Sequence, residues 1–357
     1  LVGSEMCIRD TVSTTINGKR QFFYGSTKKA ATKAMEDHLA KLTCAINYTA
    51  GITLYQWSAE WLRIKESTVA ASTLASYKYV IKTYILPYLG NMHLDAITTL
   101  NVRALLRTLS DKSARTQSYT ITVLRMMLKL AVEEELIHKN VADFVKKPKA
   151  QKVREMVTLS KAQVDQFLDV IADAELHTIF RVAFTSGLRR SELLGLRWSD
   201  VDFKAGTISV NQTVLNIEDK TTVVASTKNK SSKRTISMDP ATMAELKQHK
   251  VNVSKRRLQT LHWEDHNLVF PGKRGGARNP QKISKHCRRF AKAIRVEGFS
   301  MHGTRHTHAT LLIEAGVNFK VIQMRLGHSS YQMTMDIYSH LTPVMEADVK
   351  EKLAAIF

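Results

Sequence analysis

The sequence predicts a mainly α-helical chain with small antiparallel β-sheets, an α+β fold class. Apolar residues recur at three- and four-residue intervals within residues 53–145, which is the period of amphipathic helices. Short β-prone runs occur near the N-terminus and again between residues 207 and 236. With 357 residues, of which 44% are hydrophobic, the chain can bury a substantial core and divide into two or three domains.

The charge balance favours a polyanionic partner. Lys and Arg number 53 against 32 Asp and Glu, which gives a net charge of +21 and a pI near 9.9. Such a field attracts nucleic acid first and an anionic membrane second. No apolar run approaches the roughly 18 residues of a membrane span, and no secretory signal is found, so membrane attachment is not expected.

Cysteine usage argues against a redox or metal function. Cys7, Cys44 and Cys287 are scattered, odd in number and far from any metal-ligand spacing. This pattern fits a reduced cytosolic compartment, without a disulfide framework or a zinc site. We therefore expect no metal and no cofactor.

The first ten residues stand apart from the rest. They do not begin with Met and do not continue into the pattern that follows. We interpret residues 1–10 as non-native sequence left by a truncated or mis-assembled reading frame. In that case one strand of the following module is missing as well.

Residues 11–45 predict a small ββα module, or ββ(β)α with the missing strand. The Asn17-Gly18 pair lies between β-prone runs at residues 12–16 and 21–24, and Asn-Gly is the strongest hairpin signal because both turn residues must accept positive φ. A helix is expected over residues 31–42. A small basic sheet on one helix can lie in a DNA groove, although a solvated hairpin without a partner fits equally well. The basic side chains around the hairpin are Lys19, Arg20, Lys28 and Lys29.

Residues 53–145 predict an all-helical domain. The first helix follows a candidate N-cap, Thr53, and carries an apolar face at spacings of 3, 4 and 3. That face consists of Leu54, Trp57, Trp61 and Ile64. Further helices are expected from Ser72 or Thr73 to just before Pro87, near residues 99–110, and over residues 116–137. The aromatic and Met side chains are assigned to the core, whereas basic residues off the apolar faces, such as Arg125, either contact phosphate or are solvated.

Residues 146–154 predict an exposed basic linker and hence a domain boundary. Five cations in nine positions around a proline favour an extended tether over a packed element. Such a linker suits a protein that wraps a duplex, although an ordinary solvated linker would look the same. The five cations are Lys146, Lys147, Lys149, Lys152 and Arg154.

Residues 155–357 predict a mixed domain. Ser160 with Gln163 forms a capping-box signal, and a second helix is expected from about residue 175 to 184. Gly187 can end that helix and place Arg189 at the start of the next, one turn before Glu192. The β-prone runs 207–210 and 221–224, followed by a Lys-rich turn, predict a small antiparallel sheet, and a third helical set is expected after Ser300.

Four short blocks in this domain resemble the signature blocks of the tyrosine recombinase, or phage integrase, family. They are Thr185–Glu192 around Arg189, His302–Arg305, Leu326–Ser330 around His328, and Asp336–His340 around Tyr338. Each block alone is weak, but four in order and at fitting intervals make chance improbable. The chain resembles integrases of Gram-positive phages and conjugative transposons. The resemblance extends more loosely to a SAM-like core-binding domain and an arm-binding module before it.

Phosphoryl-transfer chemistry agrees with this resemblance. The transition state concentrates negative charge on the non-bridging oxygens of the phosphate, and guanidinium groups such as Arg189 and Arg305 can stabilise it with planar, forked donors. The resemblance implies the remaining roles, which cover nucleophile, acid, base and support. Tyr338 is the nucleophile, Lys228 the general acid with Lys230 as the alternative, His302 the proton acceptor, His328 a hydrogen-bond donor to phosphate, and Glu192 the residue that orients Arg189.

Two departures from the pattern leave the assignment in place. Gly303 stands where many relatives have Asp, and we expect it to be tolerated. Tyr331 directly follows the His328 block, which is not the position of the family's nucleophile. A metal site at His302, His306 and His308 is not expected, because no carboxylate or cysteine completes it.

The resemblance implies a site-specific DNA recombinase that integrates or excises a mobile element through a covalent 3′-phosphotyrosyl bond. It implies double-stranded DNA with core and arm sites, a homotetramer on DNA, and work at the nucleoid of a bacterial cytoplasm, and it leaves room for an excisionase or a DNA-bending accessory protein. The alternative is a DNA-binding accessory or regulatory protein without catalysis. Such a binder has no need of Tyr338, Lys228 and both arginines together.

Overall fold

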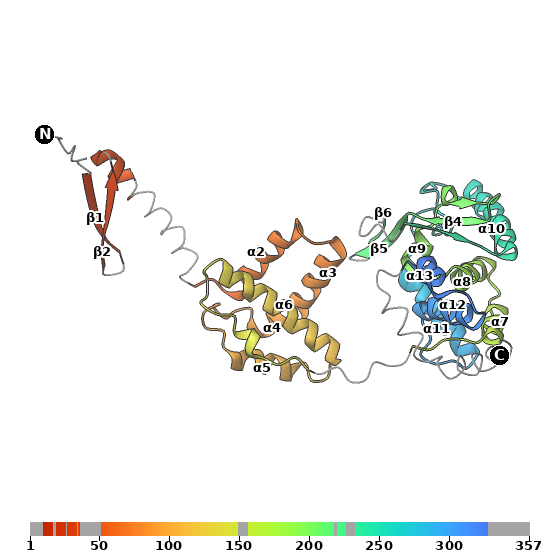
Figure 1. Cartoon of the computed structure of the whole chain (residues 1–357), viewed down its shortest axis with the longest axis horizontal. Helices are drawn as coiled ribbons and strands as arrows, with labels where there is room; N and C mark the ends of the chain where they lie inside the picture. The colour runs from red at the N-terminus through yellow and green to blue at the C-terminus, as the bar shows by residue number, and fades with distance from the viewer. Residues whose placement is uncertain are drawn as a thin grey trace, which may run out of the picture. The chain divides into compact units, whose positions relative to one another are not determined.

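The computed structural model describes residues 10–16, 19–25, 27–33, 35, 51–148, 156–217, 220–225 and 233–327. The chain divides into two compact units, Leu1–Val153 and Arg154–Phe357, and each is described by itself (Figure 1). Helices dominate both, with small antiparallel sheets, which confirms the predicted α+β class. Within the described residues, no helix combines the length and apolar character that a membrane span requires.

The N-terminal module contains the predicted hairpin. Strand β1 (Asp10–Ile16) pairs antiparallel with β2 (Lys19–Gly25), in a register that runs from Asp10 opposite Gly25 to Ile16 opposite Lys19. A helix follows over residues 28–33 and packs through Ala31, which is fully buried. This helix begins three residues earlier than predicted because Thr27 caps it: the Thr27 hydroxyl accepts a hydrogen bond from the Ala30 N–H at 3.2 Å.

The first helix of the helical domain follows its predicted signals. Helix α2 (Leu54–Glu66) has Thr53 as N-cap, in a capping box with Gln56. Trp57 and Trp61 are buried, and the Trp57 indole N–H donates to the backbone carbonyl of Met127 at 2.9 Å. The assignment of these aromatic residues to the core is therefore confirmed.

The predicted helix end before Pro87 is wrong. Helix α3 (Ala71–Val80) continues through a π-helical turn, η1 (Ile81–Ile85), into α4 (Leu86–Leu89), which contains Pro87. The Leu86 N–H bonds to the carbonyl of Ile81, five residues back, so the backbone is wider than an α-helix at this point. Pro87 occupies the first turn of α4, where a missing N–H costs least.

The longest helix of the domain, α6 (Ala114–Glu133), is followed by a short 3₁₀ helix, η2 (Val141–Phe144), and α5 (Thr99–Thr108) precedes it. Arg125 on α6 donates from Nε to the Ala142 carbonyl at 2.9 Å and from Nη2 to the Val145 carbonyl. Arg125 is therefore not a freely solvated side chain, because it holds the chain after α6 in place. Residues Ile121, Leu124 and Leu128 of α6 are fully buried.

The second unit contains the remaining helices and two small sheets. Its helices are α7 (Lys161–Asp169), α8 (Ala174–Ser186), α9 (Arg190–Gly195), η3 (Trp198–Asp200), α10 (Pro240–Gln259), α11 (Pro280–Ala293), α12 (Met301–Glu314) and α13 (Phe319–Leu326). The capping box of Ser160 with Gln163 at the start of α7 is confirmed. Helix α12 begins after Ser300 as predicted, and the Ser300 hydroxyl accepts the Gly303 N–H.

The β-prone runs form two sheets rather than one. Strands β3 (Val201–Asp202), β4 (Thr207–Val210) and β7 (Arg234–Ser237) make a three-stranded sheet, and β5 (Gln212–Ile217) pairs with β6 (Lys220–Ala225) in a separate hairpin. Two side-chain hydrogen bonds attach the chain between β4 and β5 to other parts of the unit. Asn211 donates to the Asp200 carboxylate at 2.9 Å, and Gln212 donates to the Gly195 carbonyl at 2.6 Å. The second sheet therefore begins against α9 and η3.

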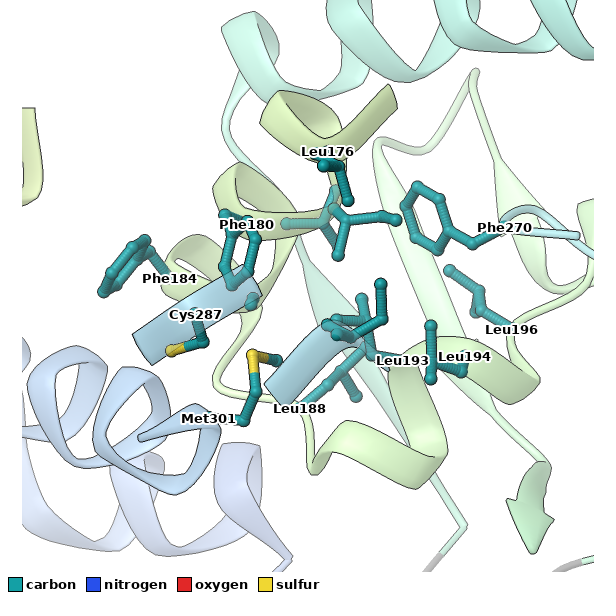
Figure 2. Close-up of a cluster of buried hydrophobic side chains, with 14 of the residues drawn as sticks. Leu176, Phe180, Phe184, Leu188, Leu193, Leu194, Leu196, Phe270, Cys287 and Met301 are labelled. Carbon is teal, nitrogen blue, oxygen red and sulfur yellow. The ribbon is translucent and has the colours of Figure 1, made fainter. Parts of the chain in front are cut away.

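An aromatic and aliphatic core fixes the helices that surround the site. Figure 2 shows Phe180 and Phe184 of α8, leucines of α9, Cys287 of α11 and Met301 of α12 in one buried cluster. Phe167 lies edge-on to four other phenylalanines at centroid distances of 5.2 to 6.0 Å. Each such buried side chain stabilises the fold by about 1.5–3 kcal/mol. The end of α8 and the start of α12 are thereby held rigidly together.

Candidate active site

Arg189 is placed by a tight turn between α8 and α9. Gly187 ends α8 with φ of +64°, in the left-handed region that favours glycine, and Arg189 is the N-cap of α9. A Cβ at Gly187 would lie 2.6 Å from His308 Cδ2 and 2.8 Å from Leu326 Cδ2. The turn therefore passes directly against α12 and α13. The side chain of Arg189 is 36% exposed and can be reached from solvent.

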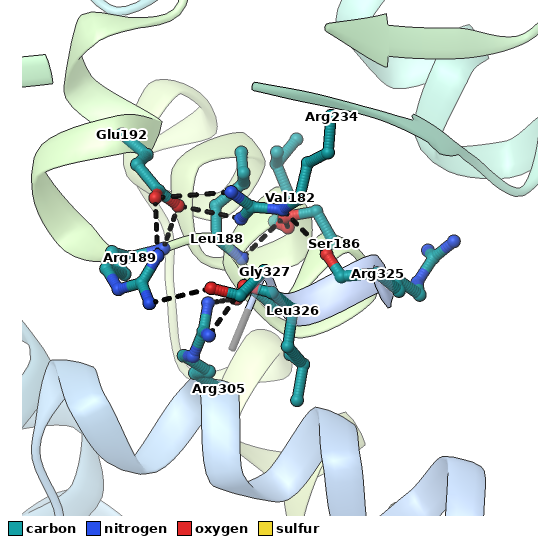
Figure 3. A network of polar contacts seen from close by, with 11 residues as sticks. Val182, Ser186, Leu188, Arg189, Glu192, Arg234, Arg305, Arg325, Leu326 and Gly327 are labelled. Carbon is teal, nitrogen blue, oxygen red and sulfur yellow. Dashed lines mark hydrogen bonds and ion pairs between the residues drawn. The ribbon is translucent and has the colours of Figure 1, made fainter. Parts of the chain in front are cut away.

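Glu192 anchors Arg189 from a buried position. Its carboxylate, 4% exposed, accepts from Arg189 Nη1 at 2.8 Å and from the Arg189 backbone N–H at 2.9 Å. Arg234 Nη2 donates to the same carboxylate at 2.8 Å (Figure 3). Burial acts to raise the pKa of Glu192, but the hydrogen bonds and charges of Arg234 and Arg189 outweigh it and hold that pKa below its usual value. Glu192 is thus a buried, ionised carboxylate between two guanidinium groups.

Arg305 lies beneath the same turn. Its guanidinium is buried and donates to the Gly187 carbonyl at 2.9 Å and to the Leu326 carbonyl at 2.6 Å, while Arg189 Nη2 donates to the Gly327 carbonyl at 3.2 Å. Burial and then repulsion from Arg189 lower the pKa of Arg305 to about 9, which leaves it protonated at neutral pH. Figure 3 shows both side chains directed at the turn that follows α13. Two like charges are held together there, an arrangement that an anion would stabilise.

His302 stands on the first turn of α12, one turn before Arg305. The residue is exposed, and its ring packs nearly perpendicular to that of His306, with 4.6 Å between ring centroids. Partial desolvation, followed by the charges of Arg305 and Arg189, lowers the pKa of His302. The imidazole is therefore neutral near pH 7 and can accept a proton.

His308 has a structural role rather than a ligand role. Its Nδ1 bonds to the Phe184 carbonyl at 2.8 Å, and its Nε2 accepts from Arg325 Nε at 3.0 Å. Burial lowers the pKa of His308 to about 3, so the ring stays neutral. Because both ring nitrogens are engaged, His308 cannot join His302 and His306 as a metal ligand.

Several expected site residues lie outside the described residues. They are Lys228, Lys230, His328 and Tyr338, together with Lys149, Lys152 and Arg154 of the linker. Tyr331, which was not expected in the site, also lies outside the described residues. The described residues that border these segments lie close to the site. Arg234 follows the Lys-rich turn in the sequence, and Gly327 directly precedes His328. The structure brings together Arg189, Glu192 and Arg305, with His302 one turn away. Of the expected DNA-binding cations, Lys28, Lys29, Lys146 and Lys147 are exposed, and Lys19 and Arg20 lie in β2.

Two arginines in the network were missed from the sequence. Arg234 and Ile236 lie two apart on β7, so they share one face of the strand, and Ile236 is 1% exposed. This alternation signals that Arg234 points inward. Arg325 donates to the Ser237 carbonyl at 2.8 Å and to the Thr185 carbonyl at 2.9 Å, and no sequence signal identifies those partners.

A basic face on α11 was also missed. No carboxylate occurs between Asp265 and Glu297, so all the charged residues in this stretch are basic. This run of one charge sign is the sequence signal that could have indicated the basic face. Ile283 and Cys287 of α11 are buried in the core. Ser284 accepts a hydrogen bond from Arg190 at 2.5 Å, and this contact places α11 beside the start of α9. The exposed cations of α11 are Lys282, Lys285, Arg288, Arg289 and Lys292.

Comparison with known proteins gives matches over both units. The model of the phage integrase family matches residues 157–344, and that of the phage integrase N-terminal SAM-like domain matches residues 53–110. The chain is 27% identical to a tyrosine recombinase XerC-like protein of Caldanaerobacter subterraneus subsp. tengcongensis, over 97% of this chain and 95% of that protein. It is 29% identical to the ICEBs1 integrase of Bacillus subtilis, over 77% of this chain and 76% of the relative.

Solved structures share the fold. The Tn1549 transposon integrase in complex with a circular intermediate DNA aligns with a TM-score of 0.70 and 23% identity, over 85% of this chain and 99% of that one. A lambda integrase dimer bound to a COC′ core site aligns with a TM-score of 0.63 and 20% identity, over 92% of this chain and 91% of that one.

Proposed function

Since the chain belongs to the phage integrase family and is a tyrosine site-specific recombinase, we propose that it integrates or excises a mobile element through a 3′-phosphotyrosyl bond at Tyr338. The observation that carries the proposal is the convergence of Arg189 and Arg305 on the turn after α13. The next residues of the chain lead to His328 and Tyr338. A paired guanidinium site at the base of a nucleophile-bearing segment suits a phosphodiester substrate.

The reaction is a pair of transesterifications. The Tyr338 hydroxyl attacks the phosphorus of one strand, His302 takes the phenolic proton, and the departing 5′ oxygen receives a proton from Lys228, or from Lys230 as the alternative. Arg189, Arg305 and His328 stabilise the charge on the non-bridging oxygens. A 5′ hydroxyl of another duplex then attacks the phosphotyrosine and releases Tyr338. One phosphodiester is broken and one is formed, so no metal, nucleotide or cofactor enters the balance.

We assign the parts of the chain to parts of the DNA. Residues 11–45 would bind arm sites through the exposed Lys28 and Lys29 and the β2 residues Lys19 and Arg20. Residues 53–145 would bind core sites, residues 146–154 would follow the phosphate backbone as a linker, and residues 155–357 would carry the chemistry.

The working species in this proposal is a homotetramer on two core sites at the nucleoid of a bacterial cytoplasm. A lambda integrase tetramer bound to a Holliday junction shares the fold, with a TM-score of 0.62 and 20% identity. An excisionase or a DNA-bending protein would set the direction. A non-catalytic accessory role is not favoured, because the matching relatives are recombinases and integrases.

A duplex that carries the attachment site and a nick next to the scissile phosphate tests the chemistry, because loss of the nicked fragment traps the covalent intermediate. We expect a denaturation-resistant protein–DNA adduct from the wild type and from Tyr331→Phe, and none from Tyr338→Phe. No adduct from intact protein bound to its own site would contradict the proposal. An adduct from Tyr338→Phe would remove Tyr338 as the nucleophile.

A further inference from the structure

Arg234 is a buried guanidinium near the catalytic arginines. It opens β7, and its side chain is 7% exposed. It donates to both oxygens of Glu192, at 3.3 Å from Nη1 and 2.8 Å from Nη2. Its Nε donates to the backbone carbonyl of Arg325 at 2.7 Å. Glu192 and Arg325 are 42 and 91 positions away along the chain, so the guanidinium ties distant segments together.

The groups that Arg234 binds contact different residues of the site. Glu192 binds Arg189 on its other side. The Arg325 carbonyl is followed by those of Leu326 and Gly327, which accept from Arg305 and Arg189, respectively. Arg234 itself directly follows residues 226–233, which hold the candidate general acids. Figure 3 shows Arg234 reaching from β7 to Glu192, with Arg189 on the far side of the carboxylate.

The contact is specific for arginine. The planar fork of a guanidinium can bind a carboxylate with two nitrogens while its Nε donates to a carbonyl, whereas an ammonium group offers one point charge. A buried carboxylate that loses one of two cationic partners is destabilised more than a solvated one, because water cannot replace the lost charge. Arg234 fixes the position of the Glu192 carboxylate and is the main group that keeps its pKa low. Without Arg234, Glu192 would be free to shift or to take up a proton, and in either case it would hold Arg189 less firmly.

We propose that Arg234 is a positioning residue for strand cleavage, which holds Glu192 and the turn after α13 so that Arg189 and Arg305 meet the phosphate together. This role rests on the proposed function. Arg234 touches neither the phosphate nor the nucleophile in this scheme and acts through Glu192 and the Arg325 carbonyl.

The test separates DNA binding from cleavage. For Arg234→Met on the nicked attachment duplex we expect a roughly 100-fold slower single-turnover adduct rate, the size of effect that a misplacement of about 1 Å produces. The Kd for the duplex, measured by fluorescence anisotropy, should change by no more than about 2-fold. Arg234→Lys keeps the charge but not the fork, and it should recover only part of the rate.

Arg278 offers a matched control elsewhere in the same unit. It also joins a carboxylate to a carbonyl: Nη2 lies 2.7 Å from Glu175 and 2.9 Å from the Pro271 carbonyl, and the side chain is 17% exposed. Arg278→Met should lower stability to urea but leave the adduct rate of the folded protein within about 2-fold of wild type. If Arg234→Met cleaves slowly and Arg278→Met does not, the defect comes from the place of Arg234 in the site and not from the loss of a buried arginine as such.

Coupling to Glu192 completes the test. In a Glu192→Gln background, Arg234→Met should slow the adduct rate by far less than in the wild type, because the carboxylate that it positions is gone. A wild-type rate for folded Arg234→Met, or full additivity with Glu192→Gln, would overturn the positioning role. If Arg234→Met does not fold, a wild-type rate for Arg234→Lys overturns it. A wild-type protein that forms no adduct would contradict the proposed function first, and the role of Arg234 with it.

Discussion

Substitution of Gly187 by Ala tests how the turn before Arg189 is built. An L-residue at φ of +64° is strained by roughly 1–2 kcal/mol. The added Cβ would also lie 2.6 Å from His308 and 2.8 Å from Leu326, and His308 is 5% exposed and held through both ring nitrogens. Overpacking of that kind costs about 1–3 kcal/mol. The sum predicts a loss of about 2–5 kcal/mol in the free energy of unfolding.

Gly316 provides the control for the packing part of that cost. It has φ of +73°, but a Cβ there would meet nothing within 4 Å. Gly316→Ala should therefore lose only the backbone contribution of roughly 1–2 kcal/mol. Urea unfolding of both variants measures the difference, and the adduct rate should fall for Gly187→Ala because the Gly187 carbonyl accepts from Arg305. Equal losses of stability in the two variants would refute the close approach of α8 to His308 and Leu326.

Three further predictions concern pH and salt. The lowered pKa of His302 should keep the adduct rate level as pH falls to 6.5, with a decline only below it, and His302→Gln should lack that decline. The pKa of His308 is about 3 in the folded protein and about 6.5 in the unfolded chain, so the free energy of unfolding should fall as pH drops from about 6.5 toward 3. Thermal melts of His308→Gln over this range should show a smaller loss of stability. On α11, Lys285→Ala should weaken DNA binding and reduce the slope of log K against log salt by about 0.9 if it contacts phosphate, whereas an unchanged slope would exclude that contact.

Local signals predicted local structure well. The N-caps Thr53 and Ser160 and the break at Gly187 depend on residues within one helical turn, and all three are confirmed. The stop at Pro87 failed because a π-helical turn, which sequence patterns do not reveal, admits the proline.

Long-range polar partners could not be predicted in the same way. Arg234 bonds to groups 42 and 91 residues away, and Arg125 bonds to carbonyls 17 and 20 residues away. Such contacts arise only once the fold has brought the segments together. The family resemblance of the four blocks implied that Arg189 and Arg305 belong to one site, and the structure joins both of them to the turn after α13. The roles of Lys228, His328 and Tyr338 stay predictions.

Mass spectrometry of the trapped intermediate tests the central claim most directly. The adduct on the nicked attachment duplex would be digested with protease and nuclease, and the peptide that carries the nucleotide would be sequenced. We expect a single modified side chain, Tyr338, joined to a 3′-phosphate. Attachment at Tyr331 or any other residue, or linkage to a 5′-phosphate, would contradict the proposed mechanism.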